Sequence, residues 1–340
     1  MVICRRMVDI ATPAIRTRGR VHARVTVAGM LLALAALGCT GTPPQDRQDP
    51  LTLAPAKWSG RFADEGYGSR IARNGATVAV GAPFGGRVYF GETVVISEPE
   101  ASFVGAGLTA FGHGFLVGAP GTGRVVMLDN SGRMTPISGD LLGSGGVIAA
   151  QGATWTASAA HGLRLSDGST KPLEERPDSI AFLSDGTLVI GCARGTVAAW
   201  IGAVAVGRVS VEDEAGYAVI VGDVDGDGQD DVVVGAPGMG EVRIYDTYGA
   251  LQATIQGEGG RFGAAVALGE SGELWVGAPM FGANVRGAVY RVRDLGPAER
   301  IYEGEAGDQL GTAVVTGHGN VIAGAPGLAE EAGSVWIERP

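Results

Sequence analysis

Val276-Gly277-Ala278-Pro279 is one of five copies of an apolar-Gly-Ala-Pro motif in this chain of 340 residues. The other four are Val80-Gly81-Ala82-Pro83, Val117-Gly118-Ala119-Pro120, Val234-Gly235-Ala236-Pro237 and Ala323-Gly324-Ala325-Pro326. A sixth, altered copy is Ile190-Gly191-Cys192-Ala193, and the glycines of the six copies are 37, 73, 44, 42 and 47 residues apart. A motif that recurs at this spacing predicts a repeat architecture.

The interval of 73 residues is about twice the others, so it predicts a hidden copy. The segment Thr156-Ala157-Ser158-Ala159 is the candidate, because it divides that interval into two nearly equal parts. The chain is then expected to contain seven units.

The unit from Arg261 to Glu303 shows what one repeat contains. Short apolar stretches predict strands at 262–267, 273–277, 287–292 and 300–302. Four short strands in about 40 residues are typical of one blade of a β-propeller. Proline cannot donate to a strand ladder, so each motif is expected to end a strand, and its small residues to lie where strands crowd toward a central axis.

The last unit reaches the end of the chain without a fourth strand. The segment Ala56–Gly60 has the same pattern as Arg300–Gly304, which is a fourth strand in the unit before. We therefore expect residues 53–59 to pair with residues 334–338 and to close a seven-bladed ring over residues 53–340. Closure removes exposed sheet edges; an open ring is the alternative.

These units resemble FG-GAP repeats, the blades of the integrin α-chain propeller and of many bacterial surface proteins. The first half of the repeat, a Phe-Gly pair, is present as Phe262-Gly263, Tyr67-Gly68 and Leu310-Gly311. It is altered at Leu142-Gly143 and lost near residue 180. The resemblance covers roughly residues 58–338. It implies an all-β fold, a seven-bladed β-propeller of four-stranded blades.

One turn stands out by its charge: Gly222-Asp223-Val224-Asp225-Gly226-Asp227-Gly228-Gln229-Asp230-Asp231. With Asp223 as position 1, carboxylates also occupy positions 3, 5 and 9, and glycine occupies position 6. This spacing curls carboxylates around a hard cation. The loop is not an EF-hand, because Val234 stands where an EF-hand has its bidentate glutamate.

The turn resembles the calcium loop of FG-GAP blades. That resemblance implies Ca²⁺ held by the side chains of Asp223, Asp225, Asp227 and Asp231 and by the carbonyl of Gln229, with Asp230 pointing away. The alternative is an acidic turn without an ion, although five aspartates this close repel one another unless a cation compensates. The other units have plain hairpin turns here, so the ion is expected to stiffen one blade.

The segment 1–38 predicts an export signal. Six arginines precede the apolar run Val25–Leu37, which at 13 residues is too short for a membrane span of about 20. The run leads into Cys39 and resembles the end of a bacterial lipoprotein signal peptide. It implies a lipidated Cys39, a flexible tether to residue 52, and a bacterial envelope location, on the outer membrane or secreted. Ordinary secretion with a free Cys39, or translation starting near Val21 or Met30, are the alternatives.

The rest of the chain is acidic: of the 26 basic and 36 acidic residues, 20 and 35 lie beyond residue 38. Nucleic acid is therefore excluded as a partner, because it needs a basic surface. Glycine makes up 58 of 340 residues, and the mean hydropathy of +0.18 is too apolar for a disordered chain.

Catalytic motifs are missing. No Gly-x-Ser-x-Gly elbow is present, and His113, His161 and His318 show no zinc spacing. Cys192 replaces the alanine of a Gly-Ala-Pro motif and is expected to be a buried, inert thiol. We expect a non-catalytic, monomeric binding or scaffold module that contacts a protein or glycan through the loops of one face.

Two other functions stay open. A propeller hydrolase or lyase would need charged or histidine side chains that converge at the mouth of the central channel, whereas an apolar or aromatic patch on one face would favour a binding module. A decayed repeat protein with an architectural role is the third possibility, because the units between residues 140 and 200 are degenerate.

Overall fold

The computed structural model describes residues 56–138, 146–159, 162–173, 175–193, 199–201, 204–205, 213–327 and 332–339. They belong to the unit Thr52–Pro340. The predicted signal peptide (1–38), Cys39, the tether that follows it and the Leu142-Gly143 copy lie outside the described residues. In the described part, no helix is long and apolar enough to cross a membrane.

The described strands form seven four-stranded antiparallel sheets. Sheet by sheet, the strands are β2 (Arg70–Asn74), β3 (Thr77–Ala82), β4 (Arg87–Phe90), β5 (Thr93–Ser97); β6 (Gly107–Phe111), β7 (Gly114–Ala119), β8 (Arg124–Asp129), β9 (Met134–Ser138); β10 (Ile148–Gln151), β11 (Thr154–Ala159), β12 (Gly162–Leu165), β13 (Thr170–Pro172); β14 (Ser179–Phe182), β15 (Leu188–Gly191), β16 (Ala199–Ile201), β17 (Val204–Ala205); β18 (Ala218–Gly222), β19 (Asp231–Ala236), β20 (Glu241–Asp246), β21 (Leu251–Gln256); β22 (Ala265–Leu268), β23 (Leu274–Ala278), β24 (Ala288–Val292), β25 (Glu299–Glu303); and β26 (Ala313–Gly317), β27 (Asn320–Ala325), β28 (Ser334–Glu338), β1 (Ala56–Ser59). Two 3₁₀ helices lie between strands: η1 (Pro83–Gly85) and η2 (Glu100–Ser102).

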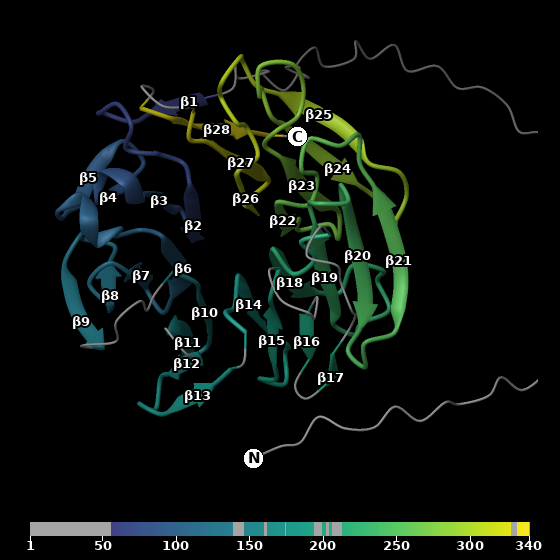
Figure 1. The fold of residues 1–340 in the computed structure, drawn as a ribbon, viewed down its shortest axis with the longest axis horizontal. Coiled ribbons are helices and arrows are strands. Elements are labelled where there is room, and N and C mark those ends of the chain that lie inside the picture. Colours follow the sequence, from purple (N-terminus) through teal and green to yellow (C-terminus); the bar gives the residue numbers. More distant parts are fainter. Residues whose placement is uncertain are drawn as a thin grey trace, which may run out of the picture. The chain divides into compact units, whose positions relative to one another are not determined.

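The sheets are arranged as blades around a central axis, with the first strand of each blade innermost (Figure 1). Each innermost strand lies beside the next, from β2 through β6, β10, β14, β18 and β22 to β26, and β26 also lies beside β2. The predicted all-β propeller of four-stranded blades is confirmed.

The fourth strand of the last blade comes from the other end of the described chain. β1 pairs antiparallel with β28, so that Ala56 lies opposite Ile337 and Ser59 lies opposite Ser334. The sequence pattern predicts this pairing. It covers the outer edge of β28, whose backbone groups would otherwise be unpaired.

The Gly-Ala-Pro motif ends the second strand of its blade, as predicted. β3, β7, β19, β23 and β27 all end at the alanine that precedes the proline. Ala157, in the hidden copy, lies on β11, which is likewise the second strand of its blade.

The glycine of the motif lies where two adjacent blades meet. A Cβ atom on Gly277 would overlap the carbonyl oxygen of Gly311, which belongs to the next blade. The same close approach joins Gly81 to Gly105, Gly191 to Gly216, Gly235 to Gly263, and Gly324 to Gly68. These glycines therefore let two adjacent blades touch backbone to backbone.

The FG half of the motif lies in a loop rather than in the predicted first strand at 262–267. Gly263 has a φ of 93°, a left-handed conformation that a strand does not accommodate, and β22 begins only at Ala265. The Gly263 N–H donates to the carbonyl of Gly277 in the same blade. Phe262 is fully buried and packs edge-to-face on Tyr290, at 5.2 Å between ring centroids.

Antiparallel blades of this kind have two unlike ends. We call the end that carries the Gly-Ala-Pro loops the GAP face; its fully described loops are 60–69, 83–86, 98–106, 120–123, 237–240, 257–264, 279–287 and 304–312. We call the opposite end, where the first strand of each blade turns into the second, the hairpin face. On the GAP face, the two loops of one blade are joined by hydrogen bonds such as the Gly85 N–H to the Glu65 carbonyl and the Met280 N–H to the Gly260 carbonyl.

Candidate metal centre

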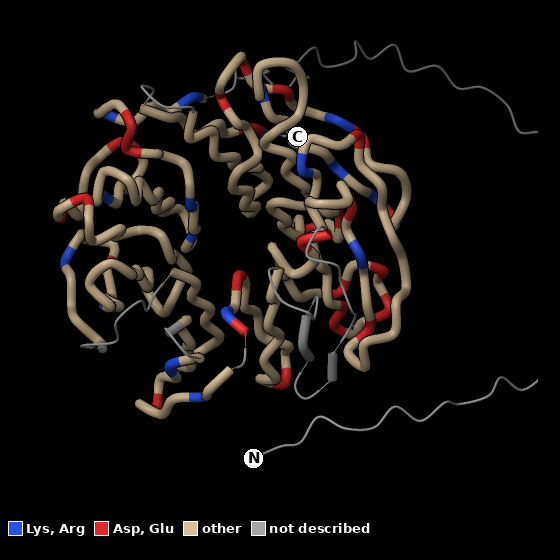
Figure 2. Tube along the Cα trace, viewed as in Figure 1, with Lys and Arg blue, Asp and Glu red and all other residues tan. Residues whose placement is uncertain are grey.

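The acidic loop lies on the hairpin face, between β18 and β19. Gly222 and Asp231 form the last pair of that hairpin, and residues 223–230 project beyond it. In Figure 2, Asp and Glu are red and uncharged residues are tan, so that groups of acidic residues stand out from the mostly uncharged blades. Gly226 and Gly228 have φ values of 80° and 83°, which glycine adopts without strain, and their backbones let the loop coil tightly.

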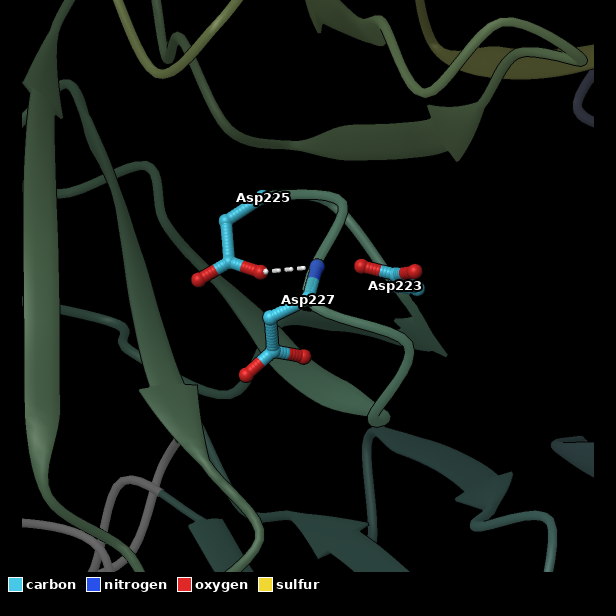
Figure 3. Close-up of side chains that lie close together, drawn as sticks. All are labelled: Asp223, Asp225 and Asp227. Carbon is cyan, nitrogen blue, oxygen red and sulfur yellow. Dashed lines mark hydrogen bonds between the residues drawn. The ribbon is translucent and has the colours of Figure 1, made fainter.

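Three of the predicted ligands come together in this loop. Asp223, Asp225 and Asp227 each offer a carboxylate oxygen within 4.8 Å of those of the other two. Figure 3 shows the three side chains grouped around the turn of the loop. Asp225 and Asp227 are exposed and Asp223 is partly buried, so the group is open to solvent.

Backbone N–H groups hold these carboxylates in place. The two oxygens of Asp223 accept from the N–H groups of Gly226 and Gly228, at 2.7 and 3.0 Å. Asp225 Oδ1 accepts from the N–H of Asp227 at 3.0 Å, which is the dashed line in Figure 3. Asp227 Oδ1 in turn accepts from the N–H of Gln229 at 2.7 Å. The loop therefore fixes three negative charges close together before any cation arrives.

Asp231 and Gln229 are placed differently. Asp231 is buried at the start of β19, and its Oδ2 accepts from the N–H of Val224 at 3.0 Å. Burial raises its pKa, and the nearby charges of Asp225 and Asp227 raise it further. Asp231 is not one of the three aspartates whose carboxylates lie close together. Gln229 donates its side-chain N–H to Asp227 Oδ2 at 3.0 Å.

Asp230 points out of the loop, as predicted. Its Oδ2 accepts from the N–H of Ser184 at 2.6 Å, and Ser184 lies in the β14–β15 turn of the neighbouring blade. Asp230 thus links two blades instead of contributing to the aspartate group.

The chemistry of the group suits a hard cation. Its donors are carboxylate oxygens alone, which Ca²⁺ and Mg²⁺ prefer, whereas Zn²⁺ sites are built with histidine or cysteine. The residues present therefore fit the metal that the sequence pattern suggests.

The channel wall offers a second place to look for a site. A hollow of about 290 Å³ runs along β6, β10, β14 and β18, and Thr109 and Gln151 are the only polar side chains that line it in the described part. His113 and His318 lie in hairpin turns of two different blades, and His161 lies outside the described residues. Neither His113 nor His318 lines this hollow.

Cys192 is buried, as predicted. Burial raises the pKa of its thiol to about 12, and the charges of Glu175 and Asp178 act in the same direction. At pH 8 the native protein then has on the order of 1,000-fold less thiolate at this position than an ordinary cysteine. We expect iodoacetamide to label the Cys192 peptide, quantified by mass spectrometry, far more slowly in the native protein than in urea. Equal labelling rates would contradict this.

The sequence reasoning missed a group of exposed apolar side chains on the GAP face. Of the eight large hydrophobic residues that are exposed in the described part, five lie in its loops: Phe62, Phe84, Phe103, Met239 and Met280, which we call the GAP-face apolar residues. No spacing in the sequence singles them out. The one local signal is that Phe84 and Met280 directly follow the proline of a Gly-Ala-Pro motif.

Three of these residues are neighbours. Phe62 lies under the Arg87 guanidinium, 4.0 Å from the ring centroid, in the loop that also packs against Phe84. η1, which carries Phe84, lies beside η2, and Phe103 directly follows η2. Phe103 has a φ of 49°, a conformation that is strained for a bulky residue and that holds its ring on the surface, 43% exposed.

Comparison with known proteins matches one segment to a family. Residues 215–249, which contain β18, the acidic loop, β19 and β20, match the FG-GAP repeat. A search of the curated proteins found no match.

Among the solved structures that share the fold are three lyase structures. Virginiamycin B lyase from Staphylococcus aureus is 11% identical, with a TM-score of 0.59, over 84% of this chain and 98% of that one. A catalytically inactive variant of that lyase with quinupristin is 10% identical, with a TM-score of 0.59, over 84% and 99%. A streptogramin B lyase is 12% identical, with a TM-score of 0.60, over 84% and 97%. Identities this low show a common fold alone. The chain therefore carries an FG-GAP repeat, at residues 215–249, within an all-β propeller of four-stranded blades.

Proposed function

We propose that this protein is a non-catalytic binding module of the bacterial cell envelope. A lipid on Cys39 anchors it, one Ca²⁺ stiffens it, and the GAP face contacts a partner. The observation that carries this proposal is that five of the eight exposed large apolar side chains of the described part lie in the loops of that one face, three of them in neighbouring loops. Exposed apolar groups of this kind mark interaction sites on soluble domains.

The body of the module is, in this proposal, one closed ring of seven blades. The pairing of β1 with β28 and the position of β26 beside β2 support closure. So does the close approach of Gly324, in the last blade, to Gly68, just before the first. A closed ring holds the loops of one face in fixed positions, which a contact surface requires.

The partner is proposed to be a protein or a glycan. Phenylalanine and methionine side chains favour a protein, because they fill apolar pockets and offer no hydrogen bonds to sugar hydroxyls. The domain is proposed to act as a monomer, with its partner on the GAP face.

Calcium has a structural role in this proposal. Asp223, Asp225 and Asp227 would hold the ion, with Asp231 and Gln229 as further ligands. Bound there, it would neutralise the charges that these carboxylates bring together. The acidic loop is on the hairpin face, opposite the GAP-face apolar residues, which supports a stiffening role over direct contact with the partner.

A lyase or hydrolase function has less support. The likeness to streptogramin B lyases is one of fold, and no ionisable side chain lines the hollow along the channel wall in the described part. An enzyme would need ionisable groups that converge there.

A capture experiment tests the GAP face. We expect Phe84→Ser and Phe103→Ser to weaken capture of the envelope partner by the immobilised protein at least tenfold, because central apolar contacts carry most of the energy of an interface. Met134→Ser is the matched control, since Met134 is an exposed apolar residue on β9, away from the GAP-face loops. Equal losses in all three variants, with circular dichroism unchanged, would refute the GAP face as the contact surface.

A further inference from the structure

A second cleft lies on the hairpin face, between the blade of β22–β25 and the blade of β26–β28. Its volume is about 250 Å³, and it is lined by the β22–β23 turn, the end of β24 and the β26–β27 turn. It is separate from the aspartate group and lies on the face opposite the GAP-face apolar residues. What it binds is therefore independent of the function proposed above.

One wall of the cleft is cationic. Arg291 and Arg293 alternate with Val292 at the end of β24, so their side chains leave the strand on the same side. Arg291 Nη2 is paired with Glu299 at 2.9 Å, and its guanidinium lies over the ring of Trp275. Arg293 is exposed and makes no ion pair within the described residues.

The other wall is anionic. Glu270 and Glu273 flank the β22–β23 turn, and both line the cleft. Glu270 accepts from the N–H of His318, across the blade boundary. Glu273 accepts from the indole N–H of Trp275 and the N–H of Ser271, both at 3.2 Å. These donors orient both carboxylates, and neither pairs with an arginine of the opposite wall in the part of the chain that is described.

From these groups we infer that the cleft binds a small zwitterion of the α-amino acid class. The ligand carboxylate would accept from the exposed guanidinium of Arg293, and its ammonium group would donate to Glu270 and Glu273. A ligand with one charge alone would satisfy one wall and be repelled by the other, whereas a zwitterion matches both.

The indole of Trp275 reports directly on this cleft, because its N–H is bonded to Glu273. The full chain, with ¹⁵N-labelled tryptophan, is titrated with L-alanine, with acetate and with methylammonium, each to 50 mM. The Trp275 resonance is identified by its loss in Trp275→Phe. We expect a saturable shift of that resonance with L-alanine and no saturable shift with either single-charge probe.

Two substitutions locate the binding groups. Arg293→Gln and Glu270→Gln each remove one exposed charge, and each is expected to weaken L-alanine binding about tenfold or more. Arg133→Gln and Glu100→Gln make the same changes at exposed positions on other blades and are expected to bind like the wild type.

Three outcomes overturn the inference. The first is no saturable shift with L-alanine, which would mean that the charged walls of the cleft are simply solvated. The second is an equal response to acetate, which makes the cleft a simple anion site. The third is undiminished binding by Arg293→Gln and Glu270→Gln. Loss of the GAP-face contact would leave this titration unchanged, so the two proposals fail separately.

Discussion

Millimolar Ca²⁺ is expected to raise the melting temperature of the wild-type protein, and Asp225→Ala is expected to abolish this rise. Asp223, Asp225 and Asp227 hold their carboxylates together in the folded loop, so a cation binds the folded state in preference to the unfolded chain. At a concentration 100-fold above its dissociation constant, such a ligand adds about 2.7 kcal/mol of stability. For a domain of this size that corresponds to a shift of about 5 °C or more, measured by circular dichroism with Ca²⁺ and with EDTA.

The matched control for the calcium experiment is Asp230→Asn. It removes the same charge from the same loop, but the Asp230 side chain bonds to Ser184 in the next blade and not to the aspartate group. We expect this variant to keep the full calcium shift. If calcium does not raise the melting temperature of the wild type, the loop is an acidic turn without an ion.

Gly277→Ala is expected to destabilise the propeller by about 3 kcal/mol, and to lower its melting temperature by about 5 °C. The added methyl group would overlap the carbonyl oxygen of Gly311, and that atom belongs to the backbone of the next blade. The two blades must then separate, because a backbone atom cannot move aside as a side-chain end can. Urea unfolding of the full chain measures the loss.

Gly272→Ala separates this clash from the general effect of losing a glycine. Gly272 has a φ of 84°, but a Cβ there would meet no atom within 4 Å. We expect a loss of about 1 kcal/mol, from backbone strain alone. A loss at Gly277 no larger than that at Gly272 would mean that the blades adjust without cost and that the glycine contact is not needed.

The sequence predicts the blades well because their signals are local. The motif Val276–Pro279 marks the end of a second strand by a proline, which cannot donate to the ladder, and β23 ends there at Ala278. The pattern of Ala56–Gly60 likewise locates β1. The contact that requires the motif glycine is not visible in the sequence, since Gly277 and Gly311 belong to different repeats and meet only across a blade boundary.

The candidate metal centre is partly predictable, because its three aspartates lie within one short loop. Asp223, Asp225 and Asp227 come together because alternate residues of one tight loop face the same side, which spacing alone reveals. The hydrogen bond between Asp231 and the N–H of Val224 depends on how the loop folds back on β19. The GAP-face apolar residues left no signal, because their exposure is decided by which loops become neighbours in the ring.

The pairing of β1 with β28 sets the order in which the molecule can be completed. β1 leaves the ribosome before every blade, and its partner strand is made after all the other described strands. All the other described strands lie between Ser59 and Ser334 in the sequence, so this contact has the highest sequence separation of any strand pair in the described part. Contacts of this kind form slowly. Until β28 arrives, β1 is an unpaired strand, and a chain that lacks residues 334–338 leaves it without a place to dock.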